Sequence, residues 1–176
     1  NIGDASYMFS GSGLATIINL STSCNNIVGM FSRCNNLVTV TNFDANGTTS
    51  YESLFEGCSG MSVAPVTTIP ATITNIKNMY KDCDGLVSID GFVLHGNITE
   101  ATGFVQGCNN LINANNVTIS GPFYNDIFRG LTSLKYVNNL LINYVGRGMT
   151  FAHMFDGCSN LVEMSFHDDS YVKDVI

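Results

Sequence analysis

The stretch MFSRCNNLVTV (residues 30–40) returns in altered copies along the chain, as LFEGCSGM from Leu54, MYKDCDGL from Met79, FVQGCNNL from Phe104 and MFDGCSNL from Met154. We call the aligned cysteine position the slot. It is occupied in turn by Ser12, Cys34, Cys58, Cys83, Cys108, Leu131 and Cys158. The chain therefore consists of seven units of about 24 residues. Such a repeat predicts a solenoid, in which each unit supplies the wall against which the next one packs.

Apolar residues recur at fixed places before the slot. An aromatic stands three positions before it in most units: Phe9, Phe31, Phe55, Tyr80, Phe128 and Phe155, with Val105 as the exception. Further apolar residues stand four and seven positions before it. This spacing is helical but covers only about two turns. We therefore expect a short helix or 3₁₀ segment in each unit, stabilised by packing.

A reversal and a strand are expected after the slot. Pairs such as Asn35-Asn36 and Asp84-Gly85 favour a sharp turn. The next residues alternate around apolar anchors and are rich in Val, Ile and Thr, which predicts a short parallel strand. The expected fold is thus an α/β repeat solenoid, similar to a leucine-rich-repeat array, with one strand and one short helix per unit. A parallel β-solenoid with little helix is the alternative.

The six cysteines do not form a pattern typical of metal binding. No two of them have CxxC spacing, and the histidines follow no cysteine pattern. The slot also accepts Ser12 and Leu131, which form no disulfide, and side chains pointing the same way from stacked units suit a disulfide poorly. For the five slot cysteines we predict buried, unpaired thiols that behave as small hydrophobic groups, whereas Cys24, outside the slot, is left open. We predict no metal and no cofactor.

The composition excludes several classes of partner. Fourteen acidic residues against seven basic ones give a net charge of −7, which does not suit nucleic acid or an anionic membrane surface. No run approaches the roughly 20 apolar residues of a membrane span. Gly11-Ser12-Gly13 lacks the Lys-Ser/Thr of a phosphate-binding loop, and His167-Asp168-Asp169 is interpreted as a solvated loop. We therefore expect no enzyme.

The phrase MFxxCxxLxxφ, with φ apolar, resembles the BspA-like leucine-rich repeats of bacterial surface proteins and of some protist and phage proteins. The stretch GMFSRCNNLVTVTNFDANGTTSYESLFEGC, from Gly29 to Cys58, is similar to the version with an NFD element after the strand. The resemblance extends over residues 5–166 and implies an extracellular, non-enzymatic binding array. The apolar residue expected five positions after the first anchor is replaced by Asn42, Gly91, Asn116 and Asn139. Unit three, MSVAPVTTIPATI, carries prolines that are expected to bend the array.

The domain organisation is predicted as one array of seven units over residues 1–166, followed by an exit segment or the start of a further repeat over 167–176. Neither terminus shows a polar capping segment. We therefore expect further repeats or a neighbouring domain at the ends, with Val175 and Ile176 beginning an eighth unit.

A binding surface is expected on the outward positions of the strands, because side chains alternate across a strand. These candidate ligand-binding residues are Thr39, Thr41, Ser88, Asp90, Asn113, Asn115, Tyr136, Asn138, Glu163 and Ser165. Tyr136, the aromatic residue among them, is the predicted anchor. The surface is otherwise short-chained, polar and mildly acidic.

Two functions remain open at this point. The first is a binding or adhesion module at a bacterial cell surface, which engages a host protein or glycan through the sheet face without inserting into a membrane. The second is a structural module of a virion, a phage fibre or decoration protein, that makes subunit contacts.

Overall fold

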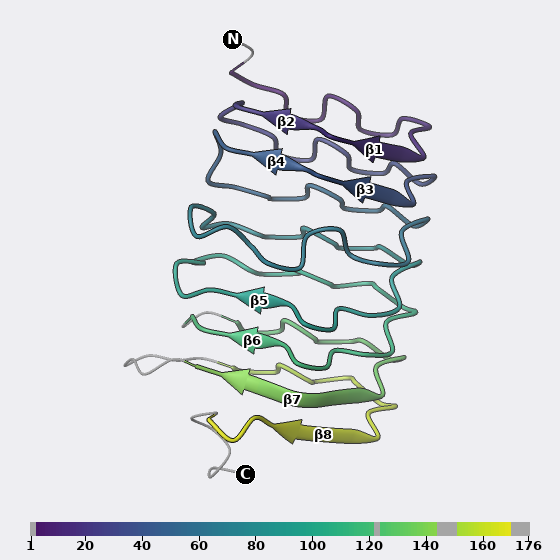
Figure 1. Ribbon diagram of the computed structural model, residues 1–176. Helices are drawn as coiled ribbons and strands as arrows, with labels where there is room; N and C mark the ends of the chain where they lie inside the picture. Colours follow the sequence, from purple (N-terminus) through teal and green to yellow (C-terminus); the bar gives the residue numbers. More distant parts are fainter. Residues whose placement is uncertain (1–2, 122–123, 144–150, 170–176) are drawn as a thin grey trace.

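The computed structural model describes residues 3–121, 124–143 and 151–169. The chain winds as a parallel β-solenoid of about six turns, and no helix occurs within these residues (Figure 1). The alternative architecture is therefore confirmed, and the helix or 3₁₀ segment expected in each unit is wrong. Val175 and Ile176 lie outside the described residues.

Two strips of short parallel strands run along one side, which we call the sheet face. The first strip contains β1 (Thr16–Ile18), β3 (Thr39–Thr41), the start of β7 (Tyr136–Ile142) and β8 (Glu163–Phe166). The second contains β2 (Ser21–Thr22), β4 (Asp44–Ala45), β5 (Val93–Leu94), β6 (Thr118–Ile119) and the end of β7. Residues one unit apart are paired in both strips, as Ile17 with Val40 and Ile119 with Ile142.

A left-handed corner separates the two strips in most units. Asn42, Asn116 and Asn139 have φ of 53–60°, and Gly91 has φ of 76°. Asn and Gly adopt this conformation at the least cost. These are the positions that depart from the apolar residue of the BspA-like pattern. The chain needs a bend there rather than another buried side chain.

The opposite side, which we call the turn face, consists of the eight residues that end at each slot. Its backbone is left-handed five positions and one position before the slot in all seven units. The residues concerned are Tyr7, Gly11, Gly29, Arg33, Ser53, Gly57, Asn78, Asp82, Gly103, Gly107, Asp126, Gly130, His153 and Gly157. A right-handed helix does not continue through a left-handed residue. Consecutive turns result instead, closed by bonds such as Met30 N–H to Ile27 C=O and Cys34 N–H to Phe31 C=O.

These turns explain why the sequence spacing suggested a helix. A turn closed between residues three apart buries side chains at intervals of three and four, as a short helix does. The difference lies in the remaining N–H groups. In units one to four and in unit six, the N–H groups at five, three and one positions before the slot donate to carbonyls of the following unit. Phe31 N–H, for example, donates to Leu54 C=O at 3.1 Å. The apolar positions were predicted correctly although the backbone was not.

We call the contact of two successive units a junction. Three such turn-face hydrogen bonds form at junctions 1/2, 2/3, 3/4, 4/5 and 6/7. At each of these the slot thiol adds another bond, because its S–H donates to the carbonyl of the aromatic position one unit earlier. The distances are 3.1 Å from Cys34 to Phe9, 3.1 Å from Cys58 to Phe31, and 3.0 Å for Cys83 to Phe55, Cys108 to Tyr80 and Cys158 to Phe128. The slot thus uses a hydrogen-bond donor as well as a small volume.

Aromatic rings stack along the core in the same rhythm. Phe9, Phe31, Phe55 and Tyr80 form a continuous stack with centroids 5.6–5.8 Å apart. Phe128 and Phe155 stack at 5.3 Å further along. Val105 interrupts the series, and Phe104 meets Tyr80 edge to face instead. The predicted aromatic position is therefore buried along most of the array.

Unit three interrupts the strand pairing of the sheet face. No backbone hydrogen bond joins residues 37–47 to residues 61–70, all of which the structure describes, and Pro65 and Pro70 lie in this unit. The Tyr80 hydroxyl replaces strand pairing for one residue of this unit. It accepts from Val66 N–H and donates to Val66 C=O, both at 3.2 Å. This contact gives a physical reason for Tyr rather than Phe at residue 80.

Candidate binding face

The predicted binding residues lie together on the sheet face, in two adjacent rows. Pairing places Ser88, Asn113, Tyr136 and Glu163 in the first row, one unit apart. Two positions further along each unit, Asp90, Asn115, Asn138 and Ser165 form the second row. Thr39 and Thr41, both exposed, occupy the same two places in β3.

The second row is largely occupied by hydrogen bonds of the fold itself. The Asp90 carboxylate accepts from Asn115 N–H at 2.6 Å, and the Asn115 side chain accepts from Asn138 N–H at 2.9 Å. Ser165 Oγ then donates to the Asn138 side-chain oxygen at 3.4 Å. These side chains tie neighbouring units together, so their polar groups are only partly available to a ligand.

The first row is freer. Tyr136 has a side chain with 36% exposure at the start of β7, and Glu163 beside it is exposed. Ser88 is the exception in this row, since its Oγ accepts from Asp90 N–H at 2.9 Å. The available polar part of the predicted face is therefore centred on Thr39, Asn113, Tyr136 and Glu163.

Apolar side chains flank the first row, and the sequence interpretation missed them. Val38, Val63, Val87 and Val162 are 56%, 70%, 39% and 72% exposed, and Ile112 is half-buried. Val38, Val87, Ile112 and Val162 all stand four positions after their slots, where unit three has Ser62 and unit six has Lys135. That recurrence was a signal for an outward apolar row, but strand residues of this type were interpreted only as strand formers. We call Val38, Val87, Ile112 and Val162 the valine row. Val63 stands five positions after its slot and pairs with Ser88, so it lies in the first row itself.

A hollow of about 490 Å³ lies across the sheet face at units four to seven. Val87 and Ile112 of the valine row line it together with Lys135, Ser133, Asn110 and Asn160. Lys135 precedes Tyr136, so the hollow adjoins the predicted anchor. The two asparagines are fixed by their amides, which donate at 2.7 Å to Asp84 C=O and Thr132 C=O.

The slot thiols are unsuited to chemistry. All five slot cysteines are unpaired; Cys34, Cys58, Cys83 and Cys108 are buried, as predicted, whereas Cys158 is half-buried. Burial raises the pKa of the Cys58 and Cys108 thiols to about 12 and that of Cys83 well above its ordinary value. A thiol that stays protonated at neutral pH is a poor nucleophile and a poor metal ligand.

Within the described ranges, no cluster of three or more His, Cys, Asp or Glu side chains is placed to hold a metal ion. In the same ranges, no helix has the length and apolar character needed to cross a membrane.

Comparisons with known proteins give no match: no family model, no curated protein and no solved structure corresponds to the chain. The BspA-like resemblance therefore stays a prediction that rests on the repeated residues alone.

Proposed function

We propose that this chain is an extracellular binding module, a non-enzymatic scaffold of a bacterial cell surface that engages a host protein or glycan through its sheet face. The observation that carries the proposal is the valine row beside Tyr136. β-Branched side chains at the same outward position of four units are unusual on a face that only meets water.

The chemistry of the face favours a protein over a glycan there. Its apolar row and single aromatic resemble the core of a protein interface, and the surrounding Thr, Asn and Glu resemble the polar rim. The second-row hydrogen bonds hold the strands in fixed register. A partner therefore meets a pre-ordered surface and little conformational entropy is lost on binding.

Substitution on the face tests this proposal. We expect Tyr136→Ala and Val87→Asp each to weaken binding at least tenfold, because the first removes the anchor and the second places a charge in the contact. Surface plasmon resonance against immobilised fibronectin, laminin, collagen and mucin provides the measurement. Glu56→Ala, on the turn face, is the control and should bind as the unaltered chain does. Equal binding by the unaltered chain and all three variants would refute the proposal. So would no binding of the unaltered chain to any of the immobilised proteins at about 50 μM.

A second candidate is a structural module of a virion, in which copies of the chain contact one another. The same valine row favours it, since an apolar row also suits a contact between identical subunits. Analytical ultracentrifugation separates the two candidates. Concentration-dependent assembly that Val162→Asp abolishes supports the subunit contact. A monomer at all concentrations with binding to one of the immobilised proteins supports adhesion.

A further inference from the structure

Junction 5/6 differs from all the others on the turn face. None of the three turn-face hydrogen bonds forms there, although every residue that would make them is described. The N–H groups of Gly103, Val105 and Gly107 have no acceptor among the described residues. The carbonyls of Asn125, Ile127 and Arg129, which stand at the accepting positions of unit six, have no donor there.

The side chains of this junction explain the opening. Unit five has Val105 where other units have an aromatic ring, so no ring stack bridges to Phe128. Unit six has Leu131 in the slot, and leucine has no S–H to donate to Val105 C=O. The sheet face remains closed, since Ala114 N–H donates to Tyr136 C=O at 2.9 Å and Asn116 N–H to Asn138 C=O at 2.8 Å. Backbone hydrogen bonds therefore join units five and six on the sheet face only.

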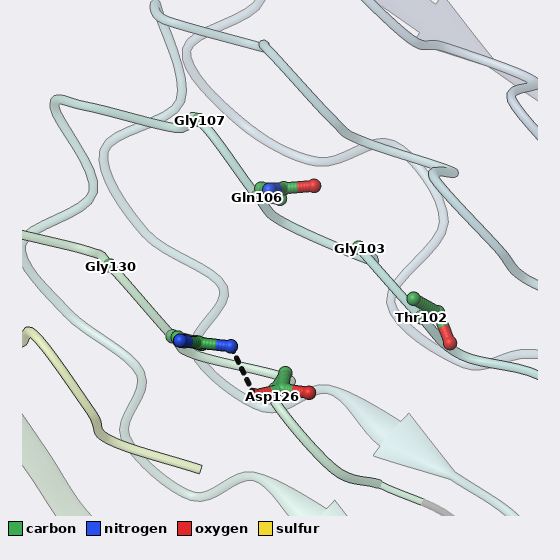
Figure 2. Close-up of a pocket in the computed structure, with 7 residues that line it drawn as sticks. Thr102, Gly103, Gln106, Gly107, Asp126 and Gly130 are labelled. Atoms are coloured by element: carbon green, nitrogen blue, oxygen red, sulfur yellow. Dashed lines mark hydrogen bonds and ion pairs between the residues drawn. The ribbon is translucent and has the colours of Figure 1, made fainter. Parts of the chain in front are cut away.

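A pocket of about 520 Å³ occupies the opening (Figure 2). Unit five contributes Thr102, Gly103, Gln106 and Gly107, and unit six contributes Asp126, Arg129 and Gly130. A second hollow of about 210 Å³, lined by Thr99, Glu100, Ala101, Thr102 and Asn125, continues along the same junction. The volume of the larger pocket falls within the range of small-molecule sites.

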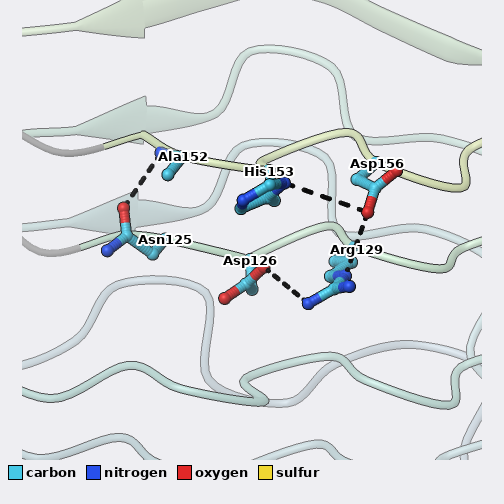
Figure 3. A network of polar contacts seen from close by, with 6 residues as sticks. All are labelled: Asn125, Asp126, Arg129, Ala152, His153 and Asp156. Atoms are coloured by element: carbon cyan, nitrogen blue, oxygen red, sulfur yellow. Dashed lines mark hydrogen bonds and ion pairs between the residues drawn. The ribbon is translucent and has the colours of Figure 1, made fainter.

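The charges at the pocket are already compensated. Arg129 contacts Asp126 and Asp156, each at 3.3 Å, and His153 lies 4.0 Å from the same Asp156 carboxylate (Figure 3). An anion would meet Asp126 and the row of carbonyls, and a cation would meet Arg129 and the row of N–H groups. The site thus favours a neutral ligand.

The arrangement of hydrogen-bond donors and acceptors further restricts the class of ligand that fits the pocket. By the geometry of the five closed junctions, one wall presents N–H groups and the facing wall presents C=O groups. An extended peptide carries N–H and C=O groups alternately on each edge, so half of its groups would meet like groups. A hydroxyl both donates and accepts, so a polyol satisfies either wall. Gln106 adds a side-chain amide that has no hydrogen bond among the described residues.

We propose that the junction 5/6 pocket binds a neutral sugar, with its hydroxyls between the N–H groups of Gly103 and Gly107 and the carbonyls of unit six. Gln106 and Asp126 hold further hydroxyls at the rim. This site lies on the turn face and is separate from the binding face proposed above. Either can therefore fail without the other.

The test is a titration of the ¹⁵N-labelled chain with the methyl glycosides of glucose, galactose, mannose and N-acetylglucosamine, followed by amide NMR. At least one of them should shift the Gly103 and Gly107 resonances in a saturable way, with a dissociation constant on the order of 1 mM. Gln106→Ala should weaken that binding about tenfold. Lys81→Ala, the same position one unit earlier, should leave it unchanged.

Three results would overturn the proposal. The first is no shift of these amides by any of the four sugars at about 50 mM. The second is tighter binding of glucuronic acid or N-acetylneuraminic acid than of the neutral sugars, which would indicate an anion site. The third is an equal response of the Gln106→Ala variant, which would place the sugar elsewhere.

Discussion

Junctions 4/5 and 5/6 share unit five, yet only the first is closed on both faces. At junction 4/5 the N–H groups of Asn78, Tyr80 and Asp82 donate across the turn face, and the Cys108 S–H donates to Tyr80 C=O. The rings of Tyr80 and Phe104 meet there at 5.7 Å. At junction 5/6 all of these contacts are missing on the turn face, while the strands still pair. The comparison shows that strand pairing alone does not close the turn face. An aromatic side chain and a slot donor accompany closure wherever it occurs.

Hydrogen exchange should show the largest difference between the two junctions. The amides of Asn78 and Asp82 donate across junction 4/5, whereas those of Gly103 and Gly107 have no acceptor across junction 5/6. We expect the second pair to exchange on the order of 10³-fold faster, because no hydrogen bond has to open before these amides exchange. Amide exchange followed by NMR measures this.

The double variant Val105→Phe with Leu131→Cys supplies the ring and the thiol that junction 5/6 lacks. It should slow the exchange of Gly103 and Gly107 and leave Asn78 unchanged. Equal exchange of the four amides in the unaltered chain would contradict the comparison.

Truncation of a core side chain should cost more in the closed part of the array. Phe55→Ala removes a ring that stacks on both Phe31 and Tyr80, and we expect a loss of about 4 kcal/mol in the free energy of unfolding. Val105→Ala at the open junction should cost about 1.5 kcal/mol, the transfer energy of its two methyl groups. Urea unfolding measures both, and equal losses would show that the two junctions are packed alike.

Alkaline pH should weaken the closed junctions through their thiols. The pKa of Cys58 is about 12 in the folded chain, mainly because of burial, and returns to its ordinary 9.0 on unfolding. Above pH 9 the unfolded chain therefore releases a proton that the folded chain retains. The stabilisation is complete below pH 9 and decreases as the pH rises towards 12, by about 1.4 kcal/mol per pH unit for this thiol.

Urea unfolding of the unaltered chain and of Cys58→Ala at pH 8–10.5 measures this slope. The variant should show a shallower decline. Cys158→Ala, at a half-buried position, serves as the control and should change the slope less. A parallel decline of the unaltered chain and Cys58→Ala would show that this thiol does not sense unfolding.

The smallest effect is expected for the ion pair across junction 3/4. Lys81 Nζ lies 3.7 Å from Glu56 Oε1 near the surface. A double-mutant cycle with Lys81→Met and Glu56→Gln should give a coupling of about 0.5 kcal/mol that disappears in 1 M salt. A coupling above about 2 kcal/mol would mean that side-chain charge, rather than backbone and ring contacts, closes the turn face.

Much of the fold was predictable from the repeat, because burial at each position depends on residue type and recurs with the unit. Cys34, Leu37 and Phe31 are buried where the pattern places them. The backbone of the turn face was not predicted, because helices and consecutive turns bury the same positions. Gly at one position before the slot in five of seven units, as at Gly57, was the available signal for a left-handed residue.

The binding face was predicted in part. The alternation of side chains along a strand places Tyr136 and Glu163 correctly on the outward face. It gives no information on the hydrogen bonds between units that occupy the side chains of Asp90 and Asn115. The pocket at junction 5/6 was not predicted. The pocket arises because Val105 supplies no aromatic ring and Leu131 supplies no S–H donor. From the sequence, both residues were interpreted as tolerated variants of their positions.

The one-way order of the turn-face hydrogen bonds has an electrical consequence. Each of these N–H groups points to the following unit and each accepting C=O to the preceding one, so the peptide dipoles add along the solenoid axis. Parallel strands contribute little to such a sum. The turn face is thus polarised along the solenoid axis, perpendicular to the local direction of the chain. Its positive end lies towards unit seven and its negative end towards unit one. In an α-helix the same dipoles lie along the chain, with the positive pole at its N-terminus.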